Sequence, residues 1–131
     1  MMRVAGAVLA GAGAALAAPW WIEGPRLAEL LGPPTPRTPA AVPRGALGAA
    51  MRLLSLLSRL PRSPWRNTCL FRSVAECLVL RRYGVPALLC IGVRSEGEAG
   101  AVEAHAWVGR AGEPPAGAPA SRGHVPLSLR A

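Results

Sequence analysis

The sequence predicts an α+β domain in which helices come first and a short antiparallel sheet follows. Two segments, 45–60 and 69–82, have the apolar periodicity of helices, with start and stop signals at their ends. After them, two apolar segments with strand character lie on either side of a polar turn. Helices followed by neighbouring strands are the order of α+β proteins, and 131 residues have room for one modest core.

The N-terminal segment 4–31 is predicted to be a helix that ends near Gly32. Its uncharged run Val4–Ile22 is rich in Ala and Gly and is about as long as the shortest membrane spans. The same region resembles a signal peptide, with a small-residue cleavage site at 15–17. Three alternatives therefore remain for this segment: a signal peptide, a helix apposed to a membrane through Val4–Ile22, and a buried helix of the domain.

A proline-rich stretch, 33–43, separates this helix from the rest of the chain. Its prolines exclude a helix and indicate a linker. We therefore divide the chain into an N-terminal helix with its linker, residues 1–44, and a domain over residues 45–131.

The second helix is predicted over Gly45–Leu60. Its polar residues Arg52, Ser55 and Arg59 share one stripe, and leucines cover the other side. Pro61 ends it.

The third helix carries the most information. Asn67 or Thr68 can cap its start, which places Cys69 in the first turn. Gly84 suits the position just after the helix end, and Pro86 follows it. The boundaries of this helix are therefore well signalled at both ends.

Strands are expected over Val85–Val93 and Ala101–Arg110, with a polar turn at 95–100 between them. A two-residue turn at 111–112 can then reverse the chain. Within the proline-rich tail, Val125–Leu129 is a candidate closing strand.

The composition excludes some classes of function. The net charge is +8, and every positively charged side chain is an arginine. The arginines are scattered and form no basic stripe interleaved with aromatic residues, so nucleic-acid binding is not expected. Three cysteines cannot all pair within the chain, which favours a reducing compartment such as the cytoplasm. They lack the spacing of a zinc site and there are two histidines, so no metal is expected.

Cys69 is the candidate nucleophile. The first turn of a helix offers unpaired N–H groups and the positive end of the helix dipole, and both favour the thiolate. The alternative, a small buried hydrophobic residue, holds for most cysteines. It is the interpretation for Cys77, which lies in mid-helix, and for Cys90, which lies in an apolar strand.

His105 is the candidate base. In its strand, Glu103, His105 and Trp107 point to one face, and the intervening residues point to the other. A single strand histidine is usually structural, but a cysteine opening a helix before a histidine on a later strand recurs in papain-like enzymes. His124, in a Gly/Pro-flanked tail, is expected at the surface.

Four motifs then follow one another in order: NTCLFRS at 67–73, RRYGVPA at 81–87, IGVR at 91–94 and AHAWV at 104–108. This order and spacing resemble the transglutaminase-like domain of lasso-peptide leader peptidases. The resemblance is close over 60–112 and looser outside that range.

The resemblance implies a small papain/transglutaminase-like fold and a cysteine peptidase that needs no cofactor. Cys69 corresponds to the family's nucleophile and His105 to its base. The implied partners are the precursor peptide, a separate leader-recognition protein and an amidotransferase-like lasso cyclase.

The chain departs from the family at the third catalytic residue. Members have an aspartate after the histidine, and this sequence contains no aspartate. A turn at 111–112 places Ala118 opposite His105. Glu113 is the nearest later acid and the candidate third member, although it would lie roughly 16 Å along the ladder. Glu103 shares the face of His105, but a neighbour along the strand has poor geometry for an orienting hydrogen bond.

Overall fold

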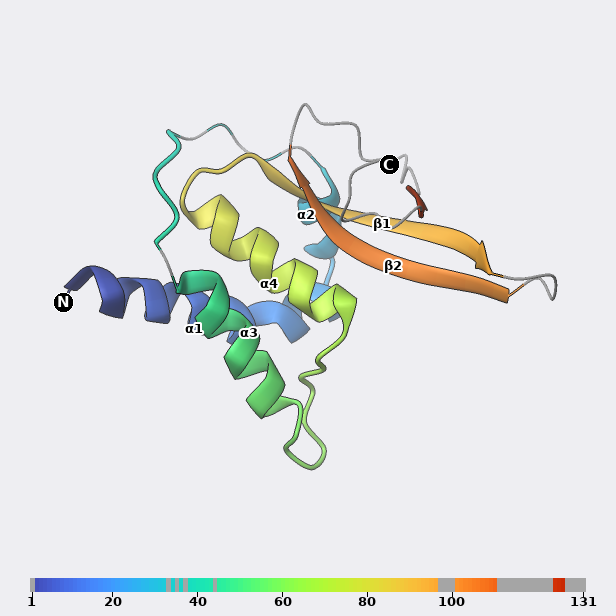
Figure 1. Cartoon of the computed structure of the whole chain (residues 1–131), viewed down its shortest axis with the longest axis horizontal. Coiled ribbons are helices and arrows are strands. Elements are labelled where there is room, and N and C mark those ends of the chain that lie inside the picture. Colours follow the sequence, from blue (N-terminus) through green and yellow to red (C-terminus); the bar gives the residue numbers. More distant parts are fainter. Residues whose placement is uncertain are drawn as a thin grey trace.

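The chain folds into helices followed by a small antiparallel sheet (Figure 1). The computed structural model describes residues 2–32, 34, 36, 38–43, 45–96, 101–110 and 124–126. The helices are α1 (Met2–Glu23), α2 (Leu27–Leu31), α3 (Ala46–Leu57) and α4 (Cys69–Arg82). The strands are β1 (Ala87–Glu96), β2 (Ala101–Arg110) and β3 (Val125–Pro126). The predicted α+β class is confirmed.

The predicted helix over 4–31 is in fact two helices. The chain breaks at Gly24 and Pro25, where Gly24 still bonds to the Trp20 carbonyl at 3.1 Å. Proline has no N–H to donate and disfavours helical geometry in the residue before it. Helix α1 accommodates Pro19 but ends where a glycine precedes a proline, at Gly24 and Pro25. The signal for the break was present in the sequence.

Helix α4 is the central element of the fold. It contacts α1 and α3 on one side and the sheet on the other, as Figure 1 shows. One core cluster lies between α4 and the sheet and includes Val74, Cys77, Leu89 and Ala106. A second lies among α1, α3 and α4 and is made largely of alanines, with Leu54. The sheet and the helix pair are therefore held together through α4.

Helix α1 packs with small residues inward and exposes several of its large residues, although Trp21 and Ile22 at its end pack against the core. Ala15 and Ala18 are fully buried, and a side-chain carbon at Gly11 would collide with the Ala46 carbonyl of α3. In contrast, Leu9 is 72% exposed and Trp20 is 65% exposed. By length and composition α1 could also cross a membrane, a property it shares with core helices and signal sequences.

Helix α4 follows its predicted boundaries, whereas α3 is shorter than predicted. Helix α3 ends at Leu57, three positions before the predicted end, and a turn follows it. Thr68 caps α4, its hydroxyl accepting from the Phe71 N–H at 3.5 Å. Gly84 has a φ of +75°, the left-handed conformation expected just past a helix end.

The sheet has the order β2-β1-β3, and both pairings are antiparallel. In β1–β2, Gly92 lies opposite His105; in β1–β3, the same Gly92 lies opposite Pro126. The last described strand thus pairs with β1 rather than with β2. The turn at 111–112, Glu113 and Ala118 lie outside the described residues.

Arg81 connects three elements through one guanidinium group. Its nitrogens donate to the carbonyls of Glu29, Leu30 and Gly32 at the end of α2, at 3.0, 3.1 and 2.8 Å. Its Nε also donates to the Ala87 carbonyl at the start of β1, at 2.9 Å. These acceptors include the carbonyls that a helix leaves unpaired at its C-terminus.

Candidate active site

Cys69 is the first residue of α4, and it is exposed. The Thr68 cap sets this helix start, because its extended backbone leads directly into the helical turn. The N–H groups of the first turn have no acceptor within a helix. The thiol therefore has solvent access and stands at the positive end of the α4 dipole, as the sequence predicted.

Ser73 ties the cysteine helix to the histidine strand. It lies one turn after Cys69, on the same side of α4, and its buried hydroxyl donates to the Ala106 carbonyl at 3.0 Å. Ala106 is the neighbour of His105 in β2. One hydrogen bond thus fixes the register between the two elements that carry the candidate catalytic residues.

Cys69 and His105 line the same cavity, whose volume is about 610 Å³. Residues on both faces of β2 border it, and β2 is an outer strand of the described sheet. The cavity therefore runs along the edge of this strand, with Cys69 reaching it from α4. Its remaining lining residues are Leu47, Met51, Arg72, Ser73, Glu76, Glu103, Ala104, Ala106, Trp107 and Val108.

The two other thiols are buried, as predicted. Burial raises the pKa of Cys77 to about 11, although the Arg81 guanidinium opposes the shift. Burial also raises the pKa of Cys90, against a backbone hydrogen bond from Gly109. Both thiols stay protonated at neutral pH and are poor nucleophiles.

Glu76 is a cavity residue that the sequence did not single out. It stands seven positions after Cys69, on the same side of α4, and lines the cavity. Burial raises the pKa of its carboxyl, and the charges of Arg110 and Arg72 act in the opposite direction. The cavity thus contains an acid that is harder to ionise than a surface glutamate, beside two cations.

Two aromatic rings pack against the imidazole of His105. The Trp107 ring stacks at a centroid distance of 5.8 Å and an angle of 17°, and the His124 ring lies 4.9 Å away at 39°. Gly92, opposite His105, makes room for the Trp107 ring, because a side-chain carbon there would come within 2.8 Å of it. The orientation of the imidazole is therefore restricted by packing.

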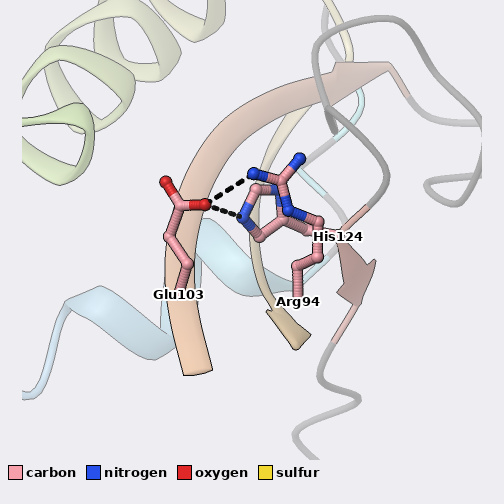
Figure 2. A network of polar contacts seen from close by, with 3 residues as sticks. All are labelled: Arg94, Glu103 and His124. Atoms are coloured by element: carbon pink, nitrogen blue, oxygen red, sulfur yellow. Dashed lines mark hydrogen bonds and ion pairs between the residues drawn. The ribbon is translucent and has the colours of Figure 1, made fainter. Parts of the chain in front are cut away.

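A polar group includes the His124 ring (Figure 2), and its Glu103 shares the face of β2 that carries His105 and Trp107. Arg94 of β1 pairs across the strands with Glu103 of β2, and its guanidinium contacts the carboxylate at 2.7 Å. The same carboxylate oxygen lies 3.6 Å from Nε2 of His124. The Glu103 carboxylate thus lies close to side chains from both β1 and the residue that precedes β3.

The expectation that His124 lies at the surface is wrong. His124 is 3% exposed. The reason is the pairing of β3 with β1, which places the residue before Val125 beside Arg94, on the face of the sheet that carries His105. The sequence predicted a closing strand at Val125–Leu129, of which the structure describes Val125–Pro126, but it did not indicate that this strand pairs with β1.

A comparison of the sequence with protein families identifies the superfamily of the chain. A model of the transglutaminase-like superfamily matches residues 11–127, which is most of the chain. The chain belongs to the transglutaminase-like superfamily. The search of curated proteins and the search of solved structures found no match.

Domains of the transglutaminase-like superfamily typically have a cysteine-protease fold. In this chain the candidate nucleophile, Cys69, lies on α4, and the candidate base, His105, lies on β2. The match extends from within α1 to the end of β3, so it includes every element that builds the cavity. The structure brings Cys69 and His105 to one cavity and adds His124 next to His105. Glu113, the candidate third member, lies outside the described residues.

Proposed function

We propose that this transglutaminase-like domain is a cysteine endopeptidase that removes the leader from a ribosomally made lasso-peptide precursor. The observation that carries the proposal is the shared cavity of Cys69, at the exposed start of α4, and His105, on the edge strand β2. The lasso-peptide substrate comes from the sequence resemblance over 60–112.

In the proposed mechanism, His105 takes the proton from the Cys69 thiol, and the thiolate attacks the scissile carbonyl. The backbone N–H of Cys69 contributes to stabilising the oxyanion. His105 then protonates the leaving amine, and water releases the acyl enzyme. Proton transfer requires a thiol–imidazole contact of about 2.6–3.2 Å, and such contacts commonly tighten when substrate binds.

The partners follow from the same resemblance. A separate leader-recognition protein would present the precursor, and an amidotransferase-like cyclase would use the product. We also propose that α1 apposes the domain to a membrane, since Leu9, Leu16 and Trp20 are exposed on it. Co-sedimentation with anionic vesicles that is lost in Trp20→Ser would support this apposition, and no co-sedimentation of the native chain would exclude it.

The proposal is tested by incubating the chain with the precursor encoded beside it and with the leader-recognition protein, followed by mass spectrometry. Cleavage should require Cys69 and His105, and Cys69→Ala should abolish it. Cys77→Ala is the matched control, because it removes a thiol that lies in the core. Cleavage by Cys69→Ala would contradict the proposal.

A second candidate is a catalytically degenerate member that binds the precursor or a partner without cutting it. It is favoured by one observation: the chain has no aspartate, so the family's orienting acid is missing. Loss of that group alone can leave a slow enzyme. Binding of the precursor without any cleavage, with the leader-recognition protein present, would decide for this candidate.

A further inference from the structure

His105 lacks the aspartate that orients the base in the family, yet its imidazole is closely surrounded. Two rings, Trp107 and His124, lie against it, and the Glu103 carboxylate lies 3.6 Å from Nε2 of His124. His124 can also carry a proton, whereas Trp107 cannot change its charge. The position beside the His105 ring is therefore occupied by a second imidazole, that of His124.

His124 is held in place by the fold. The pairing of β3 with β1 at Val93 and Gly92 fixes the chain next to it, and the side chain is almost fully buried. Its Nε2 lies 3.6 Å from the Glu103 carboxylate, which in turn is held by Arg94 at 2.7 Å. A side chain with this burial and these neighbours has a defined position relative to the His105 ring.

We propose that His124 is a positioning residue for His105 and that it couples the Glu103 carboxylate to the His105 ring. The inference rests on the proposed role of His105 as the base. Packing by His124 restricts the rotation of the His105 imidazole. The negative charge of Glu103, held against His124, favours the imidazolium that forms when the thiol proton moves from Cys69 Sγ to His105.

Other charged groups also act on the thiolate of Cys69 and the imidazolium of His105. Arg94 partly offsets the charge of Glu103, because it contacts the same carboxylate oxygen. From α4, Arg72 and Glu76 line the cavity together with Cys69. These groups are unchanged in the variants below, so a difference between variants isolates the contribution of Glu103 and His124.

The test is the rate of alkylation of Cys69 by iodoacetamide as a function of pH, resolved by peptide mass spectrometry. The variants are His124→Phe, which keeps a ring but loses the polar contact with Glu103, and Glu103→Gln, which removes the charge. Each should move the midpoint of the alkylation profile upward by about 0.5–1 pH unit, a three- to tenfold slower reaction below the midpoint. Glu29→Gln, the same charge change on an exposed part of α2, should leave the profile unchanged.

Two alternatives predict other results: a purely structural role for His124, and a different acid acting on His105. If His124→Phe reacts as the native protein does, packing alone explains the ring contact and the proposed coupling is overturned. If Glu113→Gln shifts the midpoint while Glu103→Gln does not, the acid is Glu113 and the proposal is equally overturned. Should His124→Phe fail to fold by circular dichroism, Glu103→Gln decides alone, because this side chain is 47% exposed.

The assay needs no precursor, so it separates this inference from the proposed function. Shifted profiles without precursor cleavage would leave His124 as a positioning residue in a protein of another activity. Normal cleavage with unshifted profiles would refute the role of His124 and leave the peptidase intact.

Discussion

Replacing Ser73 by Ala tests whether the cavity depends on the link between α4 and β2. The change removes the hydroxyl that donates to the buried Ala106 carbonyl at 3.0 Å. Losing a donor to a buried carbonyl costs about 1–3 kcal/mol, and the small apolar gain of alanine offsets part of this, so we expect a loss of about 1–2 kcal/mol. In a domain of this size that lowers Tm by roughly 3–10 °C.

The functional effect should exceed the loss of stability. Cys69 lies one turn from Ser73, and His105 is the neighbour of Ala106, so a loosened contact changes the geometry between the proposed nucleophile and the proposed base. We expect the alkylation of Cys69 near neutral pH to slow by about tenfold in the folded variant, since small misplacements are costly in active sites. Thermal denaturation and the alkylation rate would be measured on the same sample.

The matched control is Ser58→Ala, which removes a hydroxyl that donates to the Ser55 carbonyl within the end of α3. It should lower stability by no more than about 1 kcal/mol and leave the alkylation of Cys69 unchanged. If Ser73→Ala is as stable and as reactive as the native protein, Ser73 does not set the register of the site and our reasoning about the cavity fails.

Three further predictions concern the thiols and the sheet. In the native protein, iodoacetamide should label Cys69 first and leave Cys77 and Cys90 protected, and faster labelling of either buried thiol would argue against the assignment of the nucleophile. Burial raises the pKa of Cys77 from 9.0 to about 11, so its protonated thiol contributes to the stability of the fold below pH 9, and this contribution is lost as the pH rises toward 11. Urea denaturation should show the free energy of unfolding falling over this range, and Cys77→Ala should reduce that fall. Gly92→Ala should destabilise the fold by about 1–3 kcal/mol, because the new carbon would meet the Trp107 ring at 2.8 Å and the Val125 carbonyl at 2.7 Å; an unchanged Tm would contradict this packing.

The elements with local signals could be predicted from the sequence. Thr68, Gly84 and Pro86 gave the limits of α4 and hence the place of Cys69 at its start. The alternation in 101–110 gave the strand of His105 and the face that it shares with Glu103 and Trp107. In each case the information lies within a few residues of the element, where capping and periodicity act.

The surroundings of His105 could not be predicted, because they depend on which strands pair. A tail histidine between glycine and valine has no local signal for burial, and it is the β1–β3 pairing that places His124 beside His105. Ser73 and Glu76 were also missed as cavity residues, since that role depends on how α4 lies against β2. The break after α1 differs from these, because its Gly24–Pro25 signal was local.

The four carbonyl contacts of Arg81 have a consequence for how the chain folds. Helix α2 has five residues, too few to be stable alone, and its last carbonyls are bound by a side chain about fifty positions later in the chain. Formation of α2 is therefore coupled to the docking of α4 and β1. The N-terminal part of the chain and the sheet should accordingly unfold as one cooperative unit. Lysine, which has a single nitrogen in place of the fork, could not reproduce this coupling at position 81.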